Sequence, residues 1–221
     1  MTRLTPSVKN QITRDWNDLF PSLAVYRPMH LLRRVGPVLI GVCLERDSTN
    51  EQYRPVAHVH SLCRVFPVVT LSLSSQAHDE KMRLLTIRVA EHKESYQSAA
   101  VHLREYAYVP IEGELTLADV IQGYWYYLES PTATSKSKCF EDMALICAWH
   151  GDTDMSQRVI ETAANEMQRW PEQIRRRIDG VHGWATRLAS ATAEPARVRM
   201  TVDQQIKALG LGKVPAQELA N

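Results

Sequence analysis

The stretch VGPVLIGVCLERD, residues 35–47, decides the fold class of this chain. Its apolar residues are nearly continuous and rich in β-branched side chains, a composition that predicts a buried strand over about 37–45. Two runs that follow, 56–63 and 68–74, also predict strands. In VVTLSLS (68–74) apolar side chains alternate with hydroxyls, so one face is expected to be buried. Three strands so close in sequence indicate a small antiparallel sheet.

Most of the remaining sequence has helical periodicity. In LTPSVKNQITRDWNDLFP (4–21), Thr5 precedes Pro6, a pair typical of a helix start, and a helix is predicted over 6–19. KESYQSAAVHLREYAY (93–108) and LTLADVIQGYWYYLES (115–130) each place apolar residues on one face, with Thr116 as the expected cap of the second. The predicted fold class is α+β: a small antiparallel sheet in the N-terminal third, followed by a mostly α-helical C-terminal two-thirds.

The length of 221 residues suits a single compact domain covering 1–221. The alternative is two sub-domains, 1–75 with a helix and the small sheet, and 76–221 with the helices. PTATSKSK (131–138), which is polar and built of small residues, is the best candidate for a linker. The tail TVDQQIKALGLGKVPAQELAN (201–221) begins as a short helix and is expected to have little to bury.

CFEDMALICAWHGDTDMSQRVIETAANEMQRWP (139–171) indicates a helix, a tight Gly-Asp turn and a second helix. One face of the first helix is expected to carry Phe140, Met143, Ala144 and Cys147, and the facing side of the second Ser156, Ile160 and Ala163. The small residues among them, Ala144, Ser156 and Ala163, allow the helices to approach closely. The segment resembles a single tetratricopeptide-type hairpin, and the resemblance implies a closely packed helix pair. No second copy follows at a fixed period, so it implies no solenoid.

Charge is balanced over the whole chain. It carries 26 Lys and Arg against 25 Asp and Glu, a net charge of +1. This balance argues against nucleic acid as the main partner, because phosphate binding needs a concentrated positive field. The first ten residues, MTRLTPSVKN, lack the apolar core of a signal peptide. No apolar run approaches membrane-spanning length, so cytoplasmic residence without membrane contact is expected.

The stretch HVHSLC (58–63) raises the question of chemistry. In a strand, His58 and His60 point to the same face, a spacing that metal sites use. No further ligand lies at a spacing that selects it. Structural imidazoles are therefore the preferred interpretation, with metal binding by His58 and His60 as the alternative. The acids of GDTD (151–154) are expected to cap a helix.

Other catalytic signals are absent from the sequence. It has neither a nucleophile elbow nor a glycine-rich phosphate loop, so enzymatic activity is not favoured and no cofactor is expected. The cysteines form no CxxC pair and are expected to be buried, reduced thiols: Cys43, Cys63, Cys139 and Cys147.

GYWYYLE (123–129) contains four consecutive aromatic residues. Successive side chains on a helix are about 100° apart, so Trp125 and Tyr126 are expected at the rim or outside when Tyr124 and Tyr127 are buried. Trp, Tyr and Arg are the residue types enriched in protein-binding hot spots. Trp125 and Tyr126, together with the arginines of EQIRRRIDG (172–180), are therefore the predicted interface.

These features favour a non-enzymatic protein-binding protein. By analogy of class, the profile is that of a bacterial toxin-neutralising (immunity) or escort protein, which acts by occluding its partner. The expected partner is another protein, such as a toxin or effector, bound through Trp125, Tyr126, Arg175 and Arg176. Two alternatives stay open. One is a metal-dependent hydrolase or metal-binding protein using His58 and His60. The other is a nucleic-acid-binding protein using Arg175–Arg177 and residues 1–75, which carry 9 Lys and Arg against 5 Asp and Glu. The oligomeric state is left open.

Overall fold

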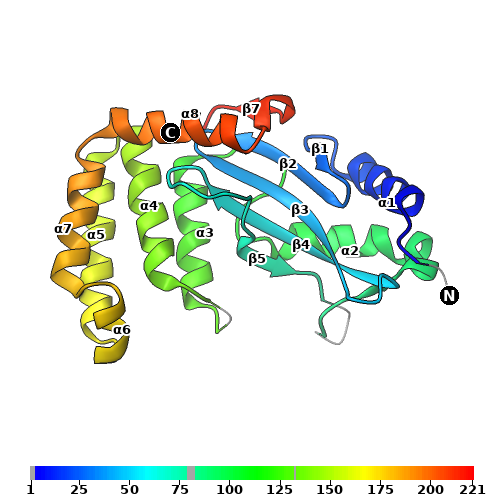
Figure 1. Cartoon of the computed structure of the whole chain (residues 1–221), viewed down its shortest axis with the longest axis horizontal. Coiled ribbons are helices and arrows are strands. Elements are labelled where there is room, and N and C mark those ends of the chain that lie inside the picture. The colour runs from blue at the N-terminus through cyan, green and yellow to red at the C-terminus, as the bar shows by residue number, and fades with distance from the viewer. Residues whose placement is uncertain (1–2, 79–82, 132) are drawn as a thin grey trace.

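The computed structural model describes residues 3–78, 83–131 and 133–221. A twisted sheet forms one part of the molecule and a row of helices the other (Figure 1). The predicted α+β class is confirmed, because the strands lie in the N-terminal part, apart from one short strand near the C-terminus, and helices dominate the C-terminal two-thirds. No helix within these residues is both long enough and apolar enough to cross a membrane.

The sheet is built around one long antiparallel pair, β3 (Val38–Arg46) and β4 (Gln52–Ser61), which are the first two predicted strands. The strand order is β1–β2–β3–β4–β5, and these neighbours are antiparallel. Two short strands pair with members of this order. β6 is antiparallel to β4, and β7 is parallel to β2. The remaining bounds are β1 (Ala24–Arg27), β2 (His30–Val35), β5 (Ser72–Gln76), β6 (Ile87–Arg88) and β7 (Ala216–Gln217).

The prediction of a strand over 68–74 is wrong in its position. Only 72–74 belong to β5, and residues 62–71 form a loop, which we call the β4–β5 loop. The backbone N–H of Thr70 donates to the Nδ1 atom of His60 at 3.1 Å, so this part of the loop bonds to a side chain of β4. Alternation of apolar and hydroxyl residues therefore arises here without a strand.

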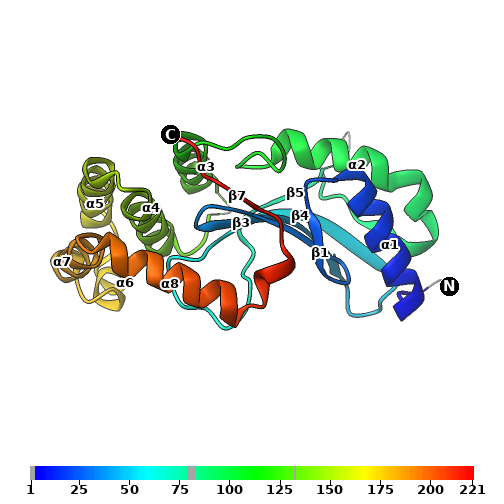
Figure 2. The same ribbon diagram turned by 90° about the horizontal axis from the view of Figure 1, so that it is seen from above.

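Helices cover both sides of the sheet. α2 (His92–Tyr106) lies on one side and α8 (Pro195–Ala208) on the other (Figure 2). We call the side opposite α2 the outer face. The inner face packs against α2 and α1 (Pro6–Leu19), which begins where the sequence predicts, with the Thr5 side chain accepting from the Val8 N–H at 3.4 Å.

A buried polar chain joins the inner face to both helices. The His92 Nε2 atom of α2 lies 2.9 Å from Asp15 Oδ2 of α1, and its Nδ1 lies 2.6 Å from the Tyr53 hydroxyl of β4. The Trp16 indole N–H donates to the same hydroxyl at 3.2 Å. Trp16 and Tyr53 are fully buried, so this chain fixes α1 and α2 on the sheet.

The C-terminal helices stand side by side in Figure 1. The predicted helix–turn–helix is confirmed: α4 (Lys136–His150) ends at Gly151, whose φ of 101° suits a left-handed turn, and Asp152 caps α5 (Thr153–Gln168) by accepting from the Met155 N–H at 2.8 Å. The predicted cap of α3 at Thr116 is confirmed as well. The other helices are α3 (Leu117–Glu129), α6 (Glu172–Arg177) and α7 (Val181–Thr192).

The expectation that the tail has little to bury is wrong. Beyond α8 the chain turns back over the sheet, where β7 pairs with Arg34 and Val35 of β2. Four apolar side chains of this segment are buried: Leu209, Leu211, Val214 and Leu219. The proposed linker at 131–138 is also shorter than expected, because residues 136–138 begin α4, and residue 132 lies outside the described residues.

Arg33 holds the tail to the sheet from inside the molecule. Its guanidinium is fully buried and donates to the Gly113 carbonyl at 2.6 Å, the Pro110 carbonyl at 3.0 Å and the Gln217 side chain at 2.9 Å. One side chain thus connects β2, the loop before α3 and β7. Hydrogen bonds to a charged donor contribute more than neutral ones, about 1.5–3 kcal/mol each.

We expect Arg33→Met to lower the free energy of unfolding by about 3 kcal/mol or more, because it leaves buried carbonyls without a donor. Arg34→Met is the matched control, since Arg34 is only partly buried and, within the described residues, its side chain donates one hydrogen bond, to the Gly36 carbonyl. Urea unfolding of both variants provides the measurement. Equal losses in the two would show that the Arg33 bonds do not hold the tail.

Candidate functional site

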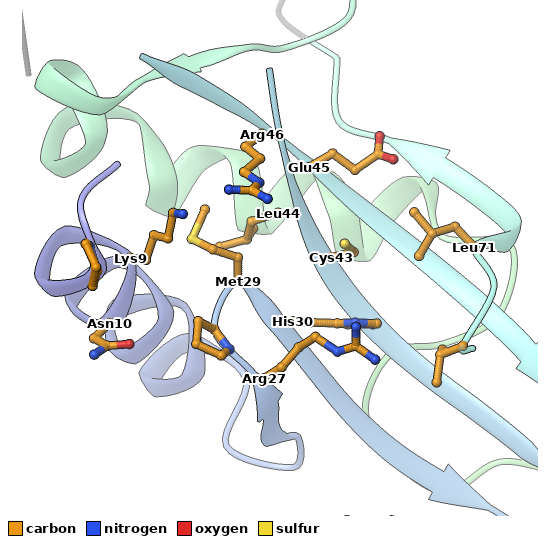
Figure 3. A pocket seen from close by; sticks show the side chains of 13 residues that line it. Lys9, Asn10, Arg27, Met29, His30, Cys43, Leu44, Glu45, Arg46 and Leu71 are labelled. Atoms are coloured by element: carbon orange, nitrogen blue, oxygen red, sulfur yellow. The ribbon is translucent and has the colours of Figure 1, made fainter. Parts of the chain in front are cut away.

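The outer face carries a cavity of about 780 Å³ next to the edge where β2 begins. Its walls come from α1, the turn between β1 and β2, the end of β3 and the β4–β5 loop. Figure 3 shows Lys9 and Arg46 on the α1 side, with Arg27, His30 and Cys43 toward the middle. We call it the basic cavity, after Lys9, Arg27 and Arg46.

The β1–β2 turn forms one wall of the basic cavity and is held from two sides. Met29 has a φ of 69°, in the left-handed region that residues other than glycine rarely adopt. Its N–H donates to the Thr13 hydroxyl of α1 at 2.9 Å, and its carbonyl accepts from the Leu44 N–H of β3 at 2.8 Å. These bonds fix Arg27 and His30, which flank the turn.

Arg27 is held in place by its neighbour Tyr26. The guanidinium carbon lies 4.6 Å from the centroid of the Tyr26 ring, and Nη2 donates to the Tyr26 hydroxyl at 3.1 Å. That hydroxyl in turn donates to the carbonyl of Leu209, just after α8, at 2.9 Å. The orientation of Arg27 therefore depends on an aromatic anchor rather than on a carboxylate.

The charges of the cavity are mostly positive. Among the described residues, Lys9, Arg27 and Arg46 form no ion pair with an aspartate or glutamate. Arg46 makes a long hydrogen bond of 3.4 Å to the Asn50 side chain. Glu45 supplies a carboxylate to the same wall. Three cations and one anion around a concave surface create a local positive potential.

Beside the cavity, two imidazoles meet over a glycine. His30 of β2 and His58 of β4 lie on strands separated by β3, yet their Nε2 atoms are 2.8 Å apart. Gly41 of β3 is paired with His58, and a Cβ there would lie 2.5 Å from a Leu32 methyl carbon and 3.2 Å from His58 Nε2. The missing side chain leaves the space in which the rings reach each other.

His60 has a different partner. Its Nδ1 accepts from the Thr70 N–H at 3.1 Å, so the proton of the neutral ring is on Nε2. The Thr70 hydroxyl lies 2.8 Å from the same Nδ1 and 3.0 Å from the Ser72 hydroxyl. Two ring nitrogens, His58 Nδ1 and His60 Nε2, are buried without a hydrogen-bond partner among the described residues.

The three histidines are neutral near pH 7. Burial, followed by electrostatic interactions with Arg27 and with the His60 ring, lowers the pKa of His30 to about 4. Burial and the nearby Arg64 lower the pKa of His60 to about 4. The pKa of His58 lies well below its usual value because the ring is completely buried, with smaller effects from His30 and His60. The positive potential of the site therefore comes from Lys and Arg.

Cys43 also lines the cavity and is the least buried of the cysteines; the other three, Cys63, Cys139 and Cys147, are buried as predicted, and all four are free. Burial, followed by the charge of Glu45, raises the pKa of the Cys43 thiol to about 11, whereas Arg27 opposes this shift. The side chain is therefore a thiol near pH 7, and thiols are weak nucleophiles. The arrangement is suited to binding an anion.

The β4–β5 loop leads from the cavity toward α4 and α8, and it exposes apolar side chains. Val65 is 74% exposed and Val68 54% exposed, with Pro67 exposed between them. Val69 and Leu71 of the same loop line the basic cavity. Apolar side chains thus continue from the cavity wall to the surface.

Both ends of this apolar loop are anchored. Arg64 donates from Nε and Nη2 to the two carboxylate oxygens of Asp142 at 2.8 and 3.1 Å, and from Nη1 to Glu141 at 3.0 Å. The Phe66 N–H donates to the buried Gln205 side chain of α8 at 2.9 Å. Thr70 is held by His60, as described above. A loop with anchors at three points has few conformations.

The residues predicted as an interface lie in two separate places. Trp125 is partly buried and packs edge-on against Phe140 with ring centroids 5.7 Å apart, whereas Tyr126 is 55% exposed. Arg175 is half-buried, and Arg176 forms an exposed ion pair of 2.5 Å with Glu172. α4 lies between α3 and α6 in both views (Figures 1 and 2), so the four residues do not make one patch.

The predicted imidazoles share a face but do not converge. His58 bonds to His30, and His60 bonds to Thr70. In the described part of the chain, no three His, Cys, Asp or Glu side chains come together in a way that could hold a metal ion. The metal-binding alternative stays a prediction that metal analysis of the purified protein can test.

Comparisons with known proteins give no relative: no family model, no curated protein and no solved structure matches this chain.

Sequence reasoning did not identify the basic cavity. Its cations, Lys9, Arg27 and Arg46, are spread over the first 46 residues. The excess of basic residues in 1–75 was the only sequence feature that pointed to a positively charged site in this region. His30 was not predicted as a site residue, because the strand that carries it, β2, was not predicted. The signal that points to it is the turn RPMH (27–30), which lies between β1, where burial alternates, and β2, which is buried at almost every position.

The buried imidazoles make stability depend on pH. Because the folded pKa values of His30 and His60 are about 4 and the unfolded value is about 6.5, the unfolded chain binds more protons as pH falls below 6.5. Each imidazole then lowers the free energy of unfolding by up to about 1.4 kcal/mol per pH unit. We expect His30→Phe to reduce this slope by up to about 1.4 kcal/mol per pH unit, which is the contribution of one proton. Urea unfolding between about pH 7.5 and 5 measures it.

His182→Phe is the control for this slope, because His182 lies exposed at the start of α7. It should leave the slope as in the unmodified chain. If His30→Phe also leaves it unchanged, His30 is not buried in the neutral form.

Proposed function

We propose that this chain is a protein-binding protein whose interface is the exposed part of the β4–β5 loop on the outer face. The observation that supports this proposal is the exposure of Val65 and Val68 on a segment that is anchored at three points. Contiguous apolar side chains on the surface mark interaction sites. Loops on a rigid scaffold are where binding residues concentrate.

Rigidity is the second argument. Ordering a loop on binding costs free energy, so a loop that is already fixed loses less of its interaction energy. Arg64 is fixed by two carboxylates, of which Asp142 is buried, and these in turn belong to α4, the central helix of the row. The apolar loop is therefore presented by the core of the helical part.

The loop replaces the aromatic patch as the preferred interface. Trp125 contacts Phe140, which leaves Tyr126 as the exposed member of the aromatic run. Arg175 and Arg176 lie on a short helix away from it. The narrower expectation, a toxin-neutralising or escort protein that occludes its partner, stays a prediction, and its partner would cover the β4–β5 loop.

The experiment has two stages. A photo-crosslinking amino acid is placed at position 68 and, as a control, at position 101, because Val101 on α2 is 51% exposed and lies on the other side of the sheet. A protein that is captured at 68 but not at 101 is then purified and its affinity measured. We expect Val65→Ser with Val68→Ser to weaken binding by about tenfold or more, which corresponds to about 1.4 kcal/mol.

Val101→Ser should leave the affinity unchanged. The proposal is overturned if no protein is captured specifically at position 68. It is also overturned if the double serine variant binds the partner as tightly as the unmodified chain. The same holds if Arg175→Glu with Arg176→Glu abolishes binding and the double serine variant does not weaken it. Light scattering of the isolated chain tests whether the partner is a second copy of this chain. In that case the unmodified chain is a dimer and the double serine variant is a monomer.

A further inference from the structure

We propose that the basic cavity is a binding site for a small organic anion that carries a phosphate or carboxylate group. The proposal is independent of the protein interface, because it rests on other residues. Lys9, Arg27 and Arg46 line one cavity, and none of them forms an ion pair with a carboxylate among the described residues, so the positive potential of the cavity is not neutralised by such pairs. An anionic ligand would neutralise it.

Arg27 is the principal recognition group. Guanidinium groups bind carboxylates and phosphates through two parallel N–H donors. Stacking on Tyr26 and the bond from Nη2 to its hydroxyl restrict the side chain before a ligand arrives. The neutral His30 ring beside it neither competes as a cation nor repels an oxyanion.

Lys9 and Arg46 lie on the α1 side of the cavity (Figure 3). They come from a helix and from the end of a strand, so their backbones are fixed. A ligand with a second anionic group can reach them while its first group contacts Arg27.

The size and the remaining walls describe the rest of the ligand. A volume of about 780 Å³ is within the range of small-molecule sites, about 300–1,000 Å³, and larger than a bare inorganic ion needs. Met29, Val69 and Leu71 supply apolar contacts. Glu45 accepts hydrogen bonds and disfavours a further negative charge at its end. The ligand class is a metabolite with two or three negative charges on phosphate or carboxylate groups and an apolar or hydroxylated body.

Pyrophosphate and citrate are the probes, one for each anionic group, and glycerol is the uncharged control. Calorimetry measures affinity, and alkylation of Cys43 by iodoacetamide, read by peptide mass mapping, locates the site. Cys43 is the cysteine of the cavity, and the other three are buried. We expect at least one probe to bind with a Kd below about 1 mM and to slow Cys43 alkylation several-fold.

Variants link this binding to the cations. Arg27→Gln and Arg46→Gln should each weaken binding by about tenfold, whereas Arg177→Gln, an exposed arginine of α6, should change it less than about twofold. Tighter binding of pyrophosphate assigns a phosphate ligand, and tighter binding of citrate a carboxylate.

The proposal is overturned if neither probe binds in this range, if binding leaves Cys43 alkylation unchanged, or if Arg27→Gln and Arg177→Gln have the same effect. Val68→Ser should leave anion binding intact, since Val68 lies outside the cavity wall. Failure of the protein-binding proposal therefore leaves this one standing, and the reverse also holds.

Discussion

The bond between His30 and His58 across Gly41 is the constraint on which the outer face depends. Two rings on strands that are not neighbours can meet only where the strand between them has no side chain. The rings stay neutral because they are covered, since a buried charge without a partner is costly. The β4–β5 loop supplies that cover and bonds to His60 through Thr70.

The cover has consequences at both of its ends. At one end its apolar residues complete the wall of the basic cavity, and at the other they reach the surface as Val65 and Val68. The loop crosses the outer face without forming a strand, and its apolar side chains are divided between the cavity wall and the surface. The exposed valines and the cavity thus have one structural origin, although they suit different ligands.

Much of the fold could be predicted from local patterns, because the deciding interactions are local. Thr5 before Pro6 and Thr116 before Leu117 mark helix starts through bonds within one turn. Gly151 and Asp152 mark the turn between α4 and α5 in the same way. Burial of β3 follows from its composition.

The rest depends on contacts between distant segments. β2 carries two arginines and a histidine, so its composition does not suggest a buried strand; Arg33 is satisfied only by carbonyl groups near residues 110, 113 and 217. The pair His58 and His60 was visible in the sequence, but its partners His30 and Thr70 were not. The cations of the cavity become neighbours only through the pairing of β2 with β3.

The bond from Tyr26 to the Leu209 carbonyl places the completion of the cavity late in synthesis. Arg27 belongs to β1, the first strand of the sheet in chain order, yet its orientation depends on a residue that is added about 180 positions later. A nascent chain that stops within α8 would contain every charged side chain of the cavity and still hold Arg27 loosely. Ligand capture would then distinguish finished molecules from truncated ones.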